Sequence, residues 1–522
     1  MSRLKKNVAT NLFGNAWSTL LSLLFVPIYI HYVGIEAWGL IGFFTTLQTL
    51  LVLADMGLST TLNREFAKTT DADNEQRRDL LRTLELVYWT VAIISGVVVV
   101  AASPFLATRW LQVRAVSTDT ARLAIALMGV VTMLQLPLGL YSGGLLGLQR
   151  QVRLNVANMT FWTLRSVGSL IVVSLISPTI TAYFIWQLIV SALHTTAVGL
   201  VLWRSLGRPA HRPVFRRELL QRIWRFSAGM MAITVTGTML TQIDKVILSR
   251  ILPLDAFGYY ALASLVAGGL FRIMNPVFVA FFPRLTQMRA ANDEEGLKAA
   301  YHAGSQLATV MLIPTAAVVA LFSKEILLLW TRNPVTAERT YLLVALLITG
   351  MAFNGINYIP YALQLAHGWI RLPLYANIAG CVTLVPLLVV LALRYGAIGA
   401  AVTSMLFSLA TLTIVISIMH RRILRGEQTR FYIQDVAKPM LSALVVVSIG
   451  RLVFPEGAGW MTQAVCIAAI LTCALVAAAM SAPATRDTGL NMIRALIRRR
   501  DPRPTESDPE SATPLPARDR PS

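Results

Sequence analysis

Apolar residues run through this chain in blocks of about twenty, separated by short polar stretches. Each block is long enough to cross a hydrocarbon core of roughly 30 Å as an α-helix. The blocks lack the period-2 alternation of a membrane β-barrel, and a helix pairs each backbone N–H and C=O within its own segment. We therefore predict an all-α polytopic membrane protein with fourteen spans, near residues 11–33, 38–62, 84–106, 119–142, 154–177, 180–203, 224–250, 256–283, 303–323, 338–363, 371–393, 396–419, 436–454 and 460–482.

The composition agrees with a bilayer as the solvent for most of the chain. Of its 522 residues, 55% are hydrophobic and 14% are charged, whereas a soluble domain carries roughly a quarter charged residues. The first apolar segment follows a basic N-terminus, as in a signal peptide. That segment is too long for an h-region and no small-residue cleavage site follows it, so we interpret it as an uncleaved first span.

Basic residues gather on one side of the predicted topology. The formal net charge is +20, from 46 Lys+Arg against 26 Asp+Glu. In a membrane protein such an excess is typical of cytoplasmic loops that hold topology and contact anionic lipid, rather than of nucleic-acid binding. The basic connections lie near 64–82, 150–153, 204–222, 284–298 and 421–438, and the loops between them are short with few basic residues. We expect a bacterial cytoplasmic (inner) membrane protein with both termini in the cytoplasm.

The cysteines predict no disulfide and no metal site. Cys381, Cys466 and Cys473 all lie inside apolar segments, where free cysteine is typical of a small core residue. Cys466 and Cys473 are seven residues apart, too far along a helix axis to be bridged. No metal-ligand spacing is present. We predict no catalytic residues, no metal and no cofactor.

An internal repeat divides the chain. Residues 34–39 read Gly-Ile-Glu-Ala-Trp-Gly between the first two spans, and residues 253–258 read Pro-Leu-Asp-Ala-Phe-Gly between the seventh and eighth. A second pair, Gly-Leu-Gln at 147–149 and Ala-Leu-Gln at 362–364, has the same separation of six spans. Six is an even number, so the halves share one orientation. This predicts two parallel six-helix lobes with a substrate site between them near the bilayer midplane.

The repeat and the loops set the expected domain boundaries. We predict an N-terminal lobe at 1–203, a basic cytoplasmic inter-lobe loop at 204–223, a C-terminal lobe at 224–420 and two extra spans at 421–482. Residues 483–522 are rich in Pro, Ser, Arg, Asp and Glu and predict a cytoplasmic basic tail that is disordered at its end. A short stretch around 492–500 has the pattern of a basic amphipathic helix on the inner leaflet.

Ionisable residues inside spans mark candidate functional positions, because each costs about 2.5–3.5 kcal/mol or more to insert. They are Asp55, Arg165, Asp244, Lys245 and Arg272. The repeat places Asp55 and Arg272 at nearly equal depth on equivalent helices of the two lobes. One hypothesis makes them an inter-lobe latch that opens when substrate or a cation enters. The alternative is two separate intra-lobe pairs that only neutralise buried charge.

The remaining charges suggest a cavity and a coupling site. Arg165, Arg272 and Lys245 would together give a positive lining, and guanidinium groups match phosphate oxygens bidentately. Asp244 is a candidate site for H⁺ or Na⁺ coupling, since a carboxylate in a low dielectric can titrate. A fixed counter-ion for Lys245 or Arg250 is the alternative. The amides Gln135, Gln187, Gln242, Asn354 and Asn357 suit either sugar hydroxyls or cross-links between helices.

Several motifs resemble those of a known family. They are the run from Gln242 to Ala263, the opening Asn11–Trp17 with 34–39, Gly147–Arg150 with Asn155, and Tyr395–Ala401. Over about residues 8–420 the chain is similar to the Wzx (RfbX) O-antigen and teichoic-acid exporters of the multidrug/oligosaccharidyl-lipid/polysaccharide (MOP) superfamily. The resemblance implies two six-helix lobes around a central, often cationic cavity with alternating access.

The resemblance also implies a substrate. Members flip undecaprenyl-diphosphate-linked glycan units from the cytoplasmic to the periplasmic leaflet, with basic residues for the diphosphate and acidic residues for H⁺ or Na⁺ coupling. Carried onto this chain, the roles fall to Arg165, Arg272 and Asp244. Membrane lipids and the polysaccharide polymerase or chain-length proteins are the expected partners, and nucleic acid is not.

Three alternatives stay open. A drug/cation antiporter of the MATE type has the same fold but prefers a cavity of net negative charge. Fourteen spans also fit a relative of the lipid II flippases. A membrane glycan polymerase or ligase needs a sizeable periplasmic loop, whereas the longest outer loops here, near 107–118 and 324–337, are short and lack paired carboxylates.

Overall fold

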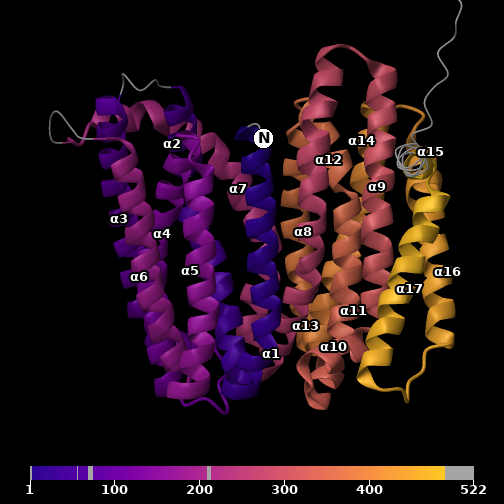
Figure 1. The fold of residues 1–522 in the computed structure, drawn as a ribbon, viewed down its shortest axis with the longest axis horizontal. Helices are drawn as coiled ribbons and strands as arrows, with labels where there is room; N and C mark the ends of the chain where they lie inside the picture. Colours follow the sequence, from indigo (N-terminus) through magenta and orange to yellow (C-terminus); the bar gives the residue numbers. More distant parts are fainter. Residues whose placement is uncertain (1–2, 56, 69–73, 208–212, 488–522) are drawn as a thin grey trace, which may run out of the picture.

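The computed structural model describes residues 3–55, 57–68, 74–207 and 213–487. These residues form helices and no named strand, which confirms the all-α prediction (Figure 1). Eleven helices of this described part are long and apolar enough to span a membrane. The architecture is thus a polytopic helical bundle, while the predicted number of fourteen spans stays a prediction.

The difference in number comes from three places. Helix α1 (Arg3–Leu51) runs through Gly34 and α13 (Arg371–Ala410) through Gly396, both with positive φ, 84° and 60°. Only glycine adopts such a φ readily, so each long helix turns sharply at a single residue. The two bends fall where the sequence predicts the connections between spans one and two and between spans eleven and twelve. The third difference is helix α7 (Arg217–Ile251), which contains the predicted span at 224–250 but is not among the eleven helices.

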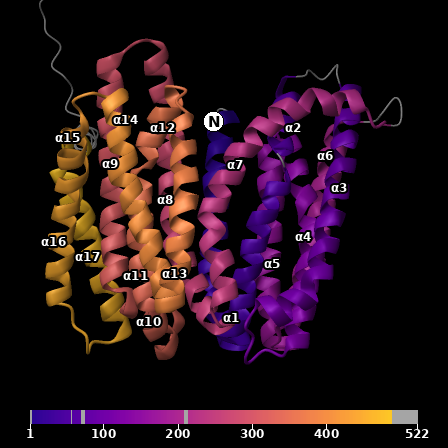
Figure 2. The same cartoon turned by 180° about the vertical axis from the view of Figure 1, so that it is seen from behind.

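The helices form two lobes (Figures 1 and 2). The first lobe contains α1 and the helices α2 (Leu58–Lys68), α3 (Asn74–Phe105), α4 (Thr118–Gly147), α5 (Gln151–Ile171) and α6 (Ile180–Ser205), with the short segments η1 (Val52–Asp55), η3 (Leu106–Trp110) and η4 (Val172–Ile176). The second contains α8 (Leu254–Ala290), α9 (Glu294–Leu321), α10 (Ser323–Thr331), α11 (Pro334–Ile356), α12 (Tyr358–Ala366), α13, η5 (Thr411–Val415) and α14 (Ile416–Arg422). Helix α7 lies between the two lobes, in contact with α1 and α13.

An additional helix pair covers the outer side of the second lobe. It consists of α15 (Gln428–Arg430), η6 (Phe431–Ala437), α16 (Lys438–Leu452) and α17 (Trp460–Ser481). Both views place α16 and α17 beside α9, at the edge farthest from the first lobe. This position agrees with a sequence in which the last two apolar segments fall outside the repeat.

The two ends of the bundle differ in charge, and we name them accordingly. The basic end holds the connections 147–151, 290–294, 366–371 and 422–428, together with the helix ends at Lys68, Asn74, Ser205 and Arg217. The opposite end holds the connections 110–118, 176–180, 251–254, 331–334 and 452–460. The loops that are rich in lysine and arginine, which are every second loop along the sequence, therefore lie together at one end of the molecule.

The lobes pack closely at the opposite end, through the repeated motif itself. A Cβ added to Gly39 would lie 2.5 Å from the carbonyl oxygen of Leu254, and one added to Gly258 would lie 2.4 Å from that of Ile35. The repeat aligns Gly39 with Gly258 and Ile35 with Leu254, so the two contacts are equivalent. Nearby, the Leu254 N–H donates to the Gln112 carbonyl oxygen at 3.0 Å. Glycine at both positions lets α1 and α8 cross backbone to backbone.

The connection between the lobes is partly helical. Helix α7 begins at Arg217, inside the predicted loop at 204–223. Before it, Asp79 of α3 accepts hydrogen bonds from the Val214 N–H at 3.0 Å and from Arg216 Nε at 2.6 Å. The predicted tail at 483–522 is described only as far as residue 487, where residues 483–487 are helical, and the predicted amphipathic stretch around 492–500 lies outside the described residues. The boundaries at 203, 223, 420 and 482 stay predictions.

Candidate functional site

A polar cavity of about 540 Å³ lies within the first lobe. Its lining combines hydroxyl, amide and charged side chains on otherwise apolar helices, and comprises Thr45, Gln48, Thr49, Leu51, Asp55, Ser59, Thr132, Gln135, Leu136, Gly139, Arg165 and Thr238. Two residues selected from the sequence, Asp55 and Arg165, therefore share one cavity. Thr238 comes from α7, so the helix that connects the lobes also contacts this space. We call it the N-lobe cavity.

Arg165 is the basic residue of the N-lobe cavity. Its Nη2 donates to Ser191 Oγ at 3.1 Å. The side-chain amide of Gln135 lies 3.1 Å from both terminal nitrogens, and with its carbonyl oxygen on that side it accepts from both. The Nε of Arg165 is buried and has no hydrogen-bond partner among the described residues. The cavity thus contains a guanidinium group held in place by Ser191 and Gln135, and such a group is a good match for an anionic ligand.

Asp55 is held within its own lobe. It lies at the end of η1 and accepts a hydrogen bond from Ser59 Oγ at 2.8 Å and another from the Tyr88 hydroxyl. Among the ion pairs of the described residues, none joins Asp55 to Arg272. The latch between these two residues therefore stays a prediction, and in the conformation described here the carboxylate is bound by hydroxyl groups.

Asp244 and Lys245 form a small polar group between α7 and α8. Asp244 Oδ2 accepts from the Tyr260 hydroxyl at 2.6 Å, and its Oδ1 lies 3.9 Å from Lys245 Nζ. Oδ1 is buried and has no hydrogen-bond partner among the described residues. Asp244 therefore lies near Lys245, as expected if Asp244 is a fixed counter-ion for this lysine. Neither residue lines the N-lobe cavity, so Lys245 does not join Arg165 in one positive lining.

The second lobe contains a cavity of about 400 Å³. Amides and tyrosines dominate its polar lining: Asn275, Asn354, Asn357, Gln364, Asn377, Tyr358 and Tyr361. Phe278 packs on both tyrosine rings, at centroid distances of 6.0 and 6.1 Å. Uncharged amides and aromatic faces suit hydroxyl-rich ligands better than anions. We call it the C-lobe cavity.

The remaining residues that the sequence selected are divided between the two cavities, and some line neither. Arg272 is exposed on α8, between Phe271, which lines the C-lobe cavity, and Ile273. Asn354 and Asn357 line the C-lobe cavity, and Gln135 lines the N-lobe cavity. Gln187 instead cross-links two helices, because its Nε2 donates to Ser169 Oγ at 3.0 Å. The structure thus separates the basic candidates, with Arg165 in one lobe and Arg272 in the other.

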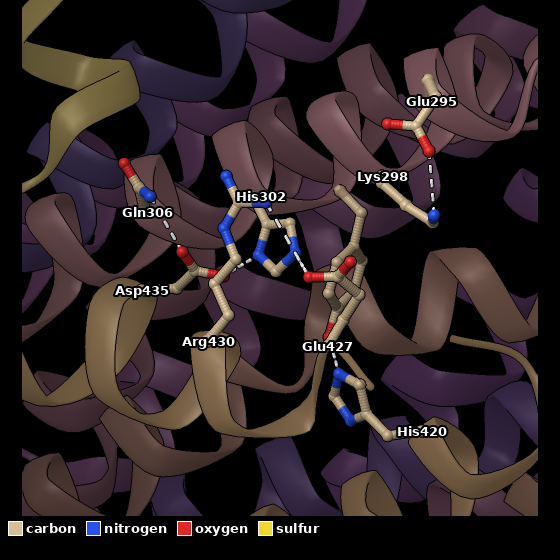
Figure 3. Close-up of polar contacts among 9 residues, drawn as sticks. Glu295, Lys298, His302, Gln306, His420, Glu427, Arg430 and Asp435 are labelled. Carbon is tan, nitrogen blue, oxygen red and sulfur yellow. Dashed lines mark hydrogen bonds and ion pairs between the residues drawn. The ribbon is translucent and has the colours of Figure 1, made fainter. Parts of the chain in front are cut away.

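The second lobe also contains a buried polar cluster that the sequence did not predict (Figure 3). His302 of α9 places Nδ1 2.5 Å from Asp435 Oδ2 and Nε2 3.1 Å from Glu427 Oε2. Gln306 Nε2 donates to the other oxygen of Asp435 at 2.8 Å. His302 is 2% exposed and Asp435 is fully buried. Only a doubly protonated imidazole ring can donate to both carboxylates.

The cluster ties the additional helix pair to the second lobe. Gln306 Oε1 also accepts from the Ala484 N–H at 2.9 Å, beyond the end of α17. Carboxylate, imidazole and amide therefore connect α9 with η6 and with the end of α17. His302 and Asp435 fall at the ends of predicted spans, where charge is unremarkable. The spacing of His302 and Gln306 by four residues, on one helix face, is the signal that would have pointed to them.

Comparisons with known proteins agree on the class of molecule. Residues 4–289 match the family described as polysaccharide biosynthesis protein, and residues 229–390 match the MatE family. A Shigella flexneri protein named "Putative O-antigen transporter" is 22% identical over 415 residues, which cover 76% of this chain and 93% of that protein. The succinoglycan biosynthesis transport protein ExoT of Rhizobium meliloti (strain 1021) is 24% identical over 469 residues, 88% of each chain.

Solved structures share the fold. The lipid II flippase MurJ in an inward closed conformation superposes with a TM-score of 0.70 at 13% identity, covering 94% of this chain and 99% of that one. An inward-facing multidrug resistance transporter of the MATE family gives 0.65 at 15% identity, covering 78% and 96%. The family match spans more than half of the chain, the relatives are transporters, and the lobes described above are those of this fold. The chain therefore belongs to the polysaccharide biosynthesis protein family.

Proposed function

We propose that this protein flips undecaprenyl-diphosphate-linked oligosaccharide units from the cytoplasmic to the periplasmic leaflet for cell-surface polysaccharide synthesis. The observation that carries the proposal is the pair of polar cavities inside apolar helices, one in each lobe. Polar groups inside a membrane are unfavourable in free energy, so polar cavities within apolar helices indicate binding of a polar ligand. The relatives named for O-antigen and succinoglycan transport support the same substrate class.

In this proposal Arg165 binds the diphosphate during transport. Its guanidinium is oriented by Gln135 and Ser191 at the wall of the N-lobe cavity. A charge-assisted hydrogen bond to phosphate is about twice as strong as a neutral one. The amide- and tyrosine-lined C-lobe cavity is suited to the sugar hydroxyls. Arg272 and Lys245, which lie outside the N-lobe cavity, are secondary contributors.

The proposed mechanism is alternating access. The close contacts that Gly39 and Gly258 make with the partner helix hold the lobes together at the opposite end. The loop charges predict that this end faces the periplasm. This arrangement supports a state that receives substrate from the cytoplasm. Asp244 and Asp55 are the proposed sites for H⁺ or Na⁺ coupling or gating, because Asp244 lies between α7 and α8 and Asp55 lines the N-lobe cavity. Within the described part of the chain, Asp244 Oδ1 also has no hydrogen-bond partner.

Reconstitution tests the function directly. Purified protein in proteoliposomes should move fluorescent lipid-linked oligosaccharide to the other leaflet, and deletion should accumulate that lipid on the inner leaflet of cells. Arg165→Gln should lower the initial rate by roughly tenfold or more, the equivalent of one charge-assisted hydrogen bond. Arg153→Gln, at an exposed position of the same helix, is the control. Transport of lipid II or of cationic drugs in place of the oligosaccharide would refute the proposal.

A further inference from the structure

A second charged pocket lies at the basic end of the second lobe. It has a volume of about 480 Å³ and is lined by side chains from four helices and the turn between α12 and α13. Its charged and aromatic lining comprises Arg289, Glu294, His367, Trp369, Arg371 and Arg422. We call it the arginine pocket. None of these residues lines the N-lobe cavity that holds Arg165.

The turn at the centre of the pocket has a defined backbone. Helix α12 ends at Ala366, and Gly368 follows with a positive φ of 67°. The Trp369 N–H donates to the Gln364 carbonyl oxygen and the Gly368 N–H to that of Leu365, both at 2.9 Å. These are the two hydrogen bonds of a Schellman motif, which needs glycine at its left-handed position. The motif therefore holds the Trp369 backbone in a fixed place beside the helix end.

The arginines of the pocket form no ion pair in the described part of the chain, and one of them is held by an aromatic ring. Arg422 lies over the Trp369 ring, with its guanidinium carbon 4.6 Å from the ring centroid. No ion pair within 4.0 Å among the described residues engages Arg289, Arg371 or Arg422. Three guanidinium groups against one carboxylate leave a net charge of +2 in the pocket. The N-terminus of α13, which begins at Arg371, adds positive potential from its free N–H groups.

The arginine pocket adjoins the C-lobe cavity. Residues Gln364, Leu365 and Ile370 of the same turn line the C-lobe cavity, while residues 367–369 and Arg371 line the arginine pocket. One short segment thus separates a positively charged space at the basic end from an amide- and tyrosine-lined space next to it. A ligand with an anionic group joined to sugars can occupy both.

We infer that the arginine pocket is a loading site that binds the diphosphate group of the lipid-linked oligosaccharide before the substrate reaches Arg165. This inference rests on the proposed function. A diphosphate diester carries two negative charges, which match the net charge of the pocket, and its oxygens suit bidentate guanidinium contacts. The single phosphate of a phospholipid headgroup would leave half of that charge unmatched. The pocket volume falls within the roughly 300–1,000 Å³ of small-ligand sites.

Site-resolved arginine labelling tests the pocket. Full-length protein in nanodiscs of neutral phosphatidylcholine is treated with phenylglyoxal, with and without inorganic pyrophosphate, and labelling is read by mass spectrometry. Pyrophosphate should protect Arg289, Arg371 and Arg422. Arg421 and Arg425 are exposed at the same end but do not line the pocket, and they should label equally in both samples.

Variants and a lipid control extend the experiment. Arg371→Gln and Arg422→Gln should each weaken pyrophosphate binding about tenfold, and Arg421→Gln should leave it unchanged. Nanodiscs that contain phosphatidylglycerol should still require pyrophosphate for protection. If pyrophosphate protects none of the three arginines of the wild-type protein, or if phosphatidylglycerol alone protects them, the inference is wrong. The wild-type measurement decides even where a variant folds poorly.

A transport assay separates this inference from the proposed function. Arg422→Gln should raise the KM for lipid-linked oligosaccharide about tenfold while the maximal rate stays near that of the wild type. If transport keeps its wild-type KM in the Arg371→Gln and Arg422→Gln variants, the loading site is refuted and the flippase function stands. If pyrophosphate protects the pocket but wild-type protein moves no lipid-linked oligosaccharide, the anion site stands and the flippase function is refuted.

Discussion

The glycine contacts between α1 and α8 offer a direct way to change the conformational equilibrium. Gly39 and Gly258 occupy equivalent positions of the repeat, and each faces a backbone carbonyl oxygen of the other helix. We predict that Gly258→Ala opens the lobes at the opposite end. The substitution adds one methyl group, which changes the packing of the closed state without introducing charge or polarity.

The magnitude follows from the contact distance. A Cβ on residue 258 would lie 2.4 Å from the Ile35 carbonyl oxygen, while ordinary contact begins at 3.4 Å. Neither partner is a flexible side chain, so the helices must separate by about 1 Å at this point. Overpacking of this kind costs about 1–3 kcal/mol. Because the open state lacks the contact, the cost shifts the equilibrium toward it by about 5- to 150-fold.

Spin-label distances measure the shift. Labels at Asp119 of α4 and Val335 of α11 are exposed near the opposite end, one in each lobe. In Gly258→Ala the longer distance should become the main population. Gly268→Ala on the same helix is the matched control, because a Cβ there meets nothing within 4 Å.

The equivalent substitution provides the refutation. Gly39→Ala should produce the same longer distance, since its contact with Leu254 mirrors that of Gly258. If both alanine variants stay monodisperse and keep the wild-type distance distribution, the close packing does not hold the closed state and the reasoning fails. A distance change in Gly268→Ala of similar size would refute it equally.

Three further predictions concern charged groups. Asp435→Ala removes the buried partner of His302 and should lower the free energy of unfolding by about 3–5 kcal/mol, measured as a lower thermal midpoint in detergent. Exchanging Asp55 with Arg272 should restore transport that either single exchange abolishes, if the two form a latch in another state. Burial and the charge of Arg289 lower the pKa of His367. Bound pyrophosphate should raise that pKa again. The affinity of the arginine pocket for pyrophosphate should therefore increase as the pH falls through the histidine range, and His367→Gln should remove this increase in affinity.

Each of these has a control within the chain. Lys298→Ala removes an exposed ion pair with Glu295 and should barely change the thermal midpoint, unlike Asp435→Ala. For the latch, failure of the double exchange to restore transport would favour two separate intra-lobe sites. For His367, the charged groups lining the same pocket are Arg289, Glu294, Arg371 and Arg422. The difference between wild type and His367→Gln therefore isolates the imidazole, and identical pH profiles would contradict the prediction.

The pattern of apolar blocks was sufficient to predict the helical bundle, because a membrane interior leaves few ways to pair a backbone. The alternation of basic loops marked one end of the molecule, and the repeat at 34–39 and 253–258 indicated two equivalent lobes. The sequence also selected Asp55 and Arg165, because an ionisable residue within an apolar segment is costly enough to stand out. It did not show that these two share a cavity, since they lie on different helices more than a hundred residues apart.

What only the tertiary structure decided concerns residues that are unremarkable in one dimension. Lys245, grouped with Arg165 from the sequence, does not line the N-lobe cavity, and the neighbouring Asp244 accepts from Tyr260 of α8, because helix rotation and packing determine which side chains meet. His302 and Asp435 sit near span ends, where charge is expected, and only the packing of α9 against η6 buries them together. The arginines of the arginine pocket are likewise ordinary basic residues of loops and helix ends in the sequence. Only the packing of their helices places them around one pocket. The period and charge of a chain determine which segments cross a membrane, whereas the convergence of side chains depends on how those segments pack.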